Sequence, residues 1–332
     1  MARTTHVGRR ALSAMGLLLT AATTLVACGS TTASAPPKAP VNVAYAGSLV
    51  NLMEHNLGTN FTAATGYTFQ GKGAGSTALA NQIKSKLISP DVFISASSGA
   101  YKTLQGDANG NVVTWYITFA TTSMVIGYSA KSQFASQLQA AANGQVPWYQ
   151  VLETPGLRLG RTDPKLDPKG VNTLYTLQLA ESYYQQPGLS KKLLGDPENA
   201  TQIFPEEELV ARLTSGQLDA GFFYANEVKD ANLPTITLPA QINLGDSSMA
   251  ADYAKASYTD STGAAKKGGP IAFSVTIPST VKNEAGAEAF VAYLLGDKGK
   301  TIFGNDGFAT TTFKLTGDTA KVPASLRQFV AA

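Results

Sequence analysis

Hydrophobic positions along the chain switch repeatedly between the spacing of a strand and that of a helix. Residues 41–45 alternate as in a strand, and the apolar residues Leu49, Leu52, Met53 and Leu57 follow at helical spacing. This succession favours an α/β fold with parallel sheets. Further strands are predicted at 67–69, 91–95, 118–128, 219–224 and 271–277, and further helices at 79–87, 172–184, 206–214 and 285–295.

The first 27 residues have the pattern of an export signal. Basic residues 1–10 precede an apolar stretch, 11–27, that is too short and too rich in threonine for a stable membrane span. The stretch ends at Leu25-Val26-Ala27-Cys28-Gly29, which resembles a bacterial lipobox and implies cleavage before Cys28 and lipid attachment to it. The alternative is an ordinary secretory signal. Residues 28–40 are small, polar and rich in proline, as in a tether.

Charge and composition exclude several classes of function. The three arginines of the leader account for the whole net charge of +3, so the chain beyond it is neutral. A neutral chain without a basic run argues against nucleic acid as a partner. His55 is the only histidine beyond the leader and Cys28 is the only cysteine. A disulfide, a Cys/His zinc site and a Cys–His nucleophile therefore lack the residues they need.

The candidate chemistry lies where strands or loops give way to helices. Ser48, Ser76 and Gly170 occupy such positions, and helix N-termini present free N–H groups that favour anions. Ordinary helix capping is the alternative for each residue. Gly47-Ser48 and Gly75-Ser76 together are stronger evidence, because ligands bind at the carboxyl ends of parallel strands. Neither loop has the glycine spacing of a known nucleotide-binding motif.

The order of motifs resembles that of the molybdate/tungstate-binding proteins of ABC importers, most closely their tungstate/molybdate branch. The resemblance covers about residues 41–310. Its motifs are Ala46-Gly47-Ser48-Leu49, Gly75-Ser76 with Ala78-Leu79-Ala80 and Ile83, Asp91–Ala96, Phe119–Tyr128, Gly160–Gly170, Glu206–Tyr224, Leu238–Asp246 and Pro270–Pro278.

The resemblance implies an α/β, periplasmic-binding-protein-like fold of type II, with two α/β lobes, a ligand cleft and two hinge crossings. The crossings are expected near 121–128 and 268–274. Lobe one would comprise residues 41–123 plus 272–332, and lobe two residues 124–271. A length of about 300 residues beyond the leader also favours two lobes, because it exceeds what one core usually carries.

The resemblance also implies an oxyanion site shared by the two lobes. Ser48 and Ser76 would donate hydroxyl and backbone N–H groups, and the loop from Asp167 to Gly170 would add backbone N–H groups. Asp167 would be a metal ligand only if the metal of the oxyanion were ligated directly. The implied ligand-binding residues are Ser48, Ser76, Asp167, Lys169, Gly170, Phe223 and Tyr224.

Three positions depart from the family pattern. Phe223 replaces a glutamate that ligates the metal, Phe273 replaces a tyrosine, and Lys169 replaces a small residue or cysteine. Without that glutamate, we expect a hydrogen-bonded tetrahedral anion with Asp167 peripheral or paired to Lys169. The alternative for Asp167 is an N-cap of the following helix. Residues 206–208, three glutamates at a helix start, are interpreted as a solvated end.

The resulting prediction is a lipid-anchored solute receptor, not an enzyme, on the outer face of the cell membrane (extracytoplasmic or periplasmic). It would bind molybdate or tungstate, need no cofactor, act as a monomer and deliver its ligand to ABC permease subunits. Sulfate or phosphate is the alternative ligand, because Phe223 and Phe273 change the site. A secreted enzyme that depends on carboxylates such as Asp167 and Asp219 is the alternative of another class. A lipoprotein that kept the fold but lost its ligand is a third.

Overall fold

The computed structural model describes residues 38–260 and 263–330. The predicted leader and most of the predicted tether, with Cys28, lie outside the described residues. Within the described part, no helix combines the length and apolar character needed to cross a bilayer.

The larger sheet has six strands and the smaller sheet has four. In spatial order the larger sheet comprises β12 (Ala309–Gly317), β4 (Trp115–Thr121), β11 (Ala272–Thr276), β3 (Val92–Ser95), β1 (Lys38–Ala46) and β2 (Tyr67–Ala74). The smaller sheet comprises β6 (Leu159–Gly160), β7 (Ala220–Tyr224), β5 (Met124–Tyr128) and β8 (Thr235–Thr237). A separate hairpin pairs β9 (Ser257–Thr259) with β10 (Ala265–Lys267).

Helices separate most of these strands along the chain, as the sequence predicts, but β12 and several helices are not among the predicted elements, and the predicted strand at 118–128 is divided between β4 and β5. The helices are α1 (Val50–Leu52), α2 (Gly58–Thr65), α3 (Ser76–Lys84), α4 (Ser98–Lys102), α5 (Ala135–Ala142), α6 (Trp148–Leu152), α7 (Pro168–Tyr183), α8 (Leu189–Leu194), α9 (Glu206–Ser215), α10 (Ala225–Asp230), α11 (Ala250–Tyr253), α12 (Glu284–Leu295) and α13 (Asp297–Asn305). Short helical turns at Gly47–Leu49 and Met53–Leu57 connect β1 to α2.

The expected parallel pairing is only partly correct, because both sheets are mixed. β1 pairs parallel with β2 and β3, and β6 pairs parallel with β7. β4, however, is inserted between β11 and β12 and runs antiparallel to both. The chain leaves the larger sheet at Thr121, enters the smaller sheet at Met124 and returns at Ala272. The rule for strand–helix–strand units does not govern such direct links, so antiparallel pairs arise.

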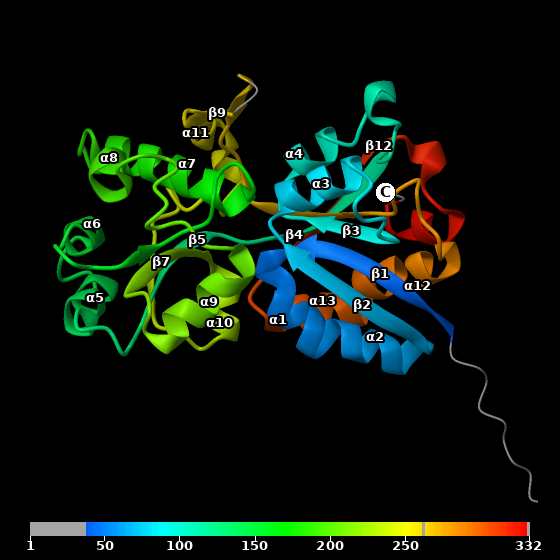
Figure 1. Ribbon diagram of the computed structural model, residues 1–332, viewed down its shortest axis with the longest axis horizontal. Coiled ribbons are helices and arrows are strands. Elements are labelled where there is room, and N and C mark those ends of the chain that lie inside the picture. The colour runs from blue at the N-terminus through cyan, green and yellow to red at the C-terminus, as the bar shows by residue number, and fades with distance from the viewer. Residues whose placement is uncertain (1–37, 261–262, 331–332) are drawn as a thin grey trace, which may run out of the picture. The chain divides into compact units, whose positions relative to one another are not determined.

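Alternating residues of β1 build the core on the two faces of the larger sheet. Val43 and Tyr45 belong to the cluster that includes Phe61 and Phe290, whereas Ala44 packs with α3 and α4 residues such as Leu79. Figure 1 shows α2, α12 and α13 on one side of this sheet and α3 and α4 on the other. Because helices cover both faces of the sheet, the candidate site lies at its edge, where β1 and β2 have their carboxyl ends.

The side chain of Asp91, just before β3, links this strand to β1 and to the residues that precede α12. Its fully buried carboxylate accepts hydrogen bonds from Asn42 N (2.8 Å) and Nδ2 (3.1 Å), and from the backbone N atoms of Lys282 and Asn283 (both 2.9 Å). Burial alone would raise the pKa of Asp91, but these donors hold it below its usual value.

We therefore expect Asp91→Asn to lower the free energy of unfolding by roughly 3 kcal/mol near neutral pH, because an amide cannot accept all these bonds. The folded-state pKa is lowered, so the stabilisation is present above the usual carboxyl pKa and is lost as the pH falls through the lowered value. Urea unfolding of both proteins at several pH values measures this difference. Exposed Asp252→Asn is the control, and an Asp91 variant equally close to wild type would contradict the prediction.

Candidate functional site

The first Gly–Ser turn follows β1, as predicted, and is packed against α9. Ser48 is buried, its Oγ has no hydrogen-bond partner, and its carbonyl accepts from Asn226 Nδ2 at 3.1 Å. A Cβ atom at Gly47 would lie only 2.7 Å from Glu206 Oε2. Glycine is therefore required here so that the turn can approach that carboxyl group.

The second Gly–Ser turn follows β2 and faces the start of α7. Ser76 is fully buried and its Oγ accepts from Ala96 N at 3.1 Å. Ala78 N donates to Leu166 O at 3.0 Å, and a Cβ atom at Gly75 would lie 3.1 Å from Asp167 Oδ2. Because β1 and β2 are neighbours, their parallel carboxyl ends bring the two turns to one edge of the larger sheet, as the sequence predicts.

Asp167 is the N-cap of α7, the alternative weighed for it in the sequence. Its Oδ1 accepts from Thr162 Oγ1 (2.7 Å), Lys169 N (2.8 Å) and Gly170 N (3.3 Å), while the buried Oδ2 has no hydrogen-bond partner. Asp167 bonds the backbone N of Lys169, whereas the ion pairs of the Lys169 ammonium are with glutamates; the place of Asp167 relative to a bound anion stays a prediction. The capping bonds draw the carboxylate inward against Gly75.

Lys169 forms its ion pairs with two glutamates instead. Its fully buried Nζ lies 2.6 Å from Glu227 Oε1 and 3.4 Å from Glu206 Oε1. Burial alone would lower the pKa of Lys169, but the charges of Glu227, Glu206 and Asp167 raise it above its ordinary value. The ammonium is therefore charged.

Glu206 is the residue that the sequence interpretation missed. It is 4% exposed, although its neighbours Glu207 and Glu208 are exposed, so the prediction of a solvated end is wrong for this residue. Burial, together with the nearby carboxylate of Asp167, raises its pKa. A signal was present: Glu206 precedes the buried Leu209 and Leu213 of α9 at helical spacing, and so lies on their face.

The remaining predicted residues pack around this centre. Tyr224 is fully buried, its hydroxyl accepts from Asn172 Nδ2 at 3.0 Å, and its backbone N donates to Glu227 Oε2 at 2.8 Å. Phe223 is buried in the apolar cluster of α9 and α10, with its ring 5.7 Å from Lys169 Nζ. Phe273 places its ring 5.9 Å from that of Tyr224.

Gly170 allows the close packing of α7 on the preceding loop. A Cβ atom there would lie 2.6 Å from Thr162 O. Its N–H already donates to Asp167. Among the described residues, no group of three or more His, Cys, Asp or Glu side chains is placed to hold a metal ion.

The model for bacterial extracellular solute-binding proteins matches residues 41–309, most of the chain. The chain belongs to this family. It is 34% identical over 257 residues to a Haloferax volcanii protein provisionally named an ABC transporter molybdenum-binding protein, covering 76% of this chain and 78% of that one. It is also 32% identical over 213 residues to the molybdate/tungstate-binding protein WtpA of Pyrococcus abyssi, covering 58% and 61%.

Structural comparison gives the same fold. The periplasmic molybdate-binding protein of Azotobacter vinelandii aligns with a TM-score of 0.58 at 20% identity, over 81% of this chain and 98% of that one. This likeness confirms the predicted α/β, periplasmic-binding-protein-like fold. The family description indicates an extracytoplasmic location for this solute-binding protein.

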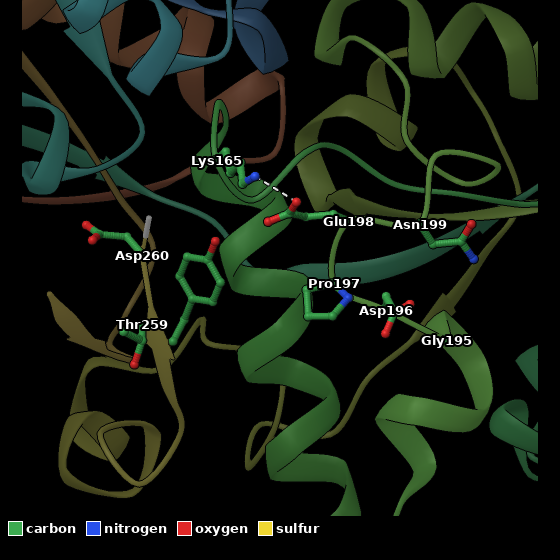
Figure 2. A pocket seen from close by; sticks show the side chains of 9 residues that line it. Lys165, Gly195, Asp196, Pro197, Glu198, Asn199, Thr259 and Asp260 are labelled. Carbon is green, nitrogen blue, oxygen red and sulfur yellow. Dashed lines mark hydrogen bonds and ion pairs between the residues drawn. The ribbon is translucent and has the colours of Figure 1, made fainter. Parts of the chain in front are cut away.

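Two of the pockets in the described part of the chain bear on the buried centre and its surroundings. One of about 580 Å³ adjoins it, with Thr77 and Ala96 on the side of the larger sheet and Pro168 on that of α7. Its lining includes four lysines: Lys102, Lys266, Lys267 and Lys314. The other, of about 840 Å³, opens between the loops shown in Figure 2, where Lys165 Nζ lies 2.7 Å from Glu198 Oε2.

Removing the buried ammonium should destabilise this solute-binding protein strongly. We expect Lys169→Met to lower the free energy of unfolding by about 3–5 kcal/mol, because Glu227 loses its counter-charge. Adding Glu227→Gln should restore most of the loss. Urea unfolding of the ligand-free proteins measures both effects. The control is Lys165→Met, which breaks the exposed pair in Figure 2 and should change stability by less than about 1 kcal/mol. Equal losses in the two lysine variants would contradict the argument.

Proposed function

We propose that this protein is the lipid-anchored solute receptor of an ABC importer, and that it binds molybdate or tungstate. Two relatives whose names specify molybdenum, or molybdate and tungstate, support this ligand class. The proposal includes the lipid anchor at Cys28, capture between two lobes that close by a hinge, action as a monomer and delivery to a permease. It is a binding function without catalysis or a cofactor.

The observation that carries the proposal is that both Gly–Ser turns meet helix starts: Gly75 lies against Asp167 at α7, and Gly47 lies against Glu206 at α9. The buried Oγ of Ser48 has no partner there, and α3, α7, α9 and α10 begin around the same centre. Helix N-termini and hydroxyl groups are the donors that a tetrahedral dianion needs. A handful of hydrogen bonds to a charged ligand, each about 1.5–3 kcal/mol, accounts for binding between micromolar and nanomolar.

The adjoining pocket suits the approach of an anion. Its four lysines carry positive charge, and the residues that line it include no aspartate or glutamate. A concave surface of one charge sign raises the local concentration of ligands of opposite sign and their association rate. Ser97, the N-cap of the short helix α4, is also part of this lining.

Calorimetric titration of the full-length protein with molybdate, tungstate, sulfate and phosphate tests the proposal. We expect Kd values of about 1 μM or less for molybdate or tungstate, and sulfate at least about 100-fold weaker. Preferential sulfate or phosphate binding would replace the proposed ligand. If none of the four anions binds, the proposal of an oxyanion receptor is overturned.

Ser48→Ala should weaken molybdate or tungstate binding about tenfold, because one hydrogen bond to a charged ligand is lost. The matched control is Ser190→Ala in α8, which removes another buried hydroxyl that lacks a partner. Ser190 belongs to none of the contacts described at the site, so its variant should bind like wild type. The same titrations measure both, and equal affinities for the two variants would contradict a ligand contact by Ser48.

A further inference from the structure

Asn226 connects the first Gly–Ser turn, after β1 of the larger sheet, to the elements of the smaller sheet. It lies in the first turn of α10, which follows β7, and is 1% exposed. Its Nδ2 donates to the Ser48 carbonyl oxygen at 3.1 Å, and its Oδ1 accepts from Thr122 Oγ1 at 3.2 Å. A carbonyl oxygen only accepts hydrogen bonds, so the amide nitrogen must face Ser48. Both ends of this buried amide therefore have a partner.

Thr122 lies where the chain passes from one sheet to the other. It follows β4 of the larger sheet and precedes β5 of the smaller sheet. Its backbone N donates to Ile271 O at 3.4 Å, and Ile271 directly precedes β11, where the chain returns to the larger sheet. These are the two links at which the proposed hinge would bend. Asn226 therefore joins the Ser48 turn to both of them.

The bond from Asn226 fixes how the Ser48 turn is oriented. The peptide unit is planar, so a bond to the Ser48 carbonyl oxygen also fixes the direction of the N–H group that follows it. The Ser48 hydroxyl, which lacks a partner, belongs to the same turn. A turn already held in one orientation loses less conformational freedom when a ligand binds, and this raises affinity. The bond spans the two sheets, so it forms only while their elements are together.

We propose that Asn226 is a positioning residue, which holds the Ser48 turn in its binding orientation when the two lobes close and thereby strengthens retention of the oxyanion. This inference rests on the proposed function and adds to it a residue that acts through Ser48. The amide is suited to this role because it donates to the Ser48 turn with one end and accepts from the link between the sheets with the other.

The test compares Asn226→Leu with Asn51→Leu, the same substitution at the other end of α10. Asn51 is exposed, and its Nδ2 donates to Asp230, the last residue of that helix. Full-length wild type and both variants are titrated calorimetrically with molybdate and tungstate. For Asn226→Leu we expect the Kd to rise at least about tenfold, because the turn loses its hydrogen bond and its orientation. For Asn51→Leu the Kd should stay within about twofold of wild type.

A double-mutant cycle with Ser48→Ala separates positioning from a general structural role. If Asn226 acts through Ser48, Asn226→Leu should weaken binding by less than about threefold in the Ser48→Ala background. Equal weakening in the two backgrounds would show a structural role and overturn the proposal. An unchanged Kd for Asn226→Leu in the wild-type background would also overturn it, while the proposed function stands if wild type binds.

Thr122→Val is the second variant, which decides the question if ligand-free Asn226→Leu shows no cooperative melting. It removes the hydroxyl group that orients the amide and keeps the donor to Ser48. We expect its Kd to rise about fivefold, and by less in the Ser48→Ala background. A Kd equal to that of wild type would contradict the proposal.

The remaining outcomes concern the ligand. If wild type prefers sulfate or phosphate, the molybdate or tungstate assignment fails, and the same cycle with the preferred anion decides the role of Asn226. If wild type binds none of the four anions, the proposed function fails and this inference fails with it.

Discussion

The burial of one ammonium group among three carboxyl groups constrains the whole site. Lys169 Nζ loses its hydration inside the protein, a cost of several kcal/mol that only close counter-charges offset. Glu227 and Glu206 supply them, and both glutamates lie in the first turn of a helix. The ion pairs therefore hold the starts of α7, α9 and α10 at one point. A shift of any one of these helices would change the distances between the ammonium group and the carboxyl groups.

The same acids lie at helix N-termini, around which the anion site is proposed. Helix N-termini favour negative charge, whether from a ligand or from the protein. Asp167 caps α7, Glu206 begins α9, and Glu227 accepts a hydrogen bond from the backbone N of Tyr224, the N-cap of α10. By contrast, the first turn of α3 contains no acid. The acids of this centre therefore come from α7, α9 and α10, and none comes from the first turn of α3.

Local patterns were sufficient for β1, β2, β3, β7, β11 and the two turns, but not for β12, several helices or the full site. Alternation at Val43 and Tyr45, and the Gly–Ser pairs after two neighbouring strands, predicted the edge at which the turns meet. The burial of Glu206 depends on Gly47, which is remote in sequence and close only after the two sheets have formed. Its spacing from Leu209 indicated the buried face, yet three consecutive glutamates are typical of a solvated helix start. The insertion of β4 between β11 and β12 is likewise a tertiary property that strand patterns do not encode.

Stability and ligand capture place opposite demands on this centre. A buried polar atom without a partner costs about 1–3 kcal/mol, and the Ser48 hydroxyl is such an atom, whereas the carboxyl groups of Asp167 and Glu206 interact with each other. Apolar or amide side chains of similar size would make a more stable ligand-free protein. A ligand that gives the Ser48 hydroxyl a partner recovers the lost stability only when it is bound, so the same atom increases the difference between the bound and the empty protein.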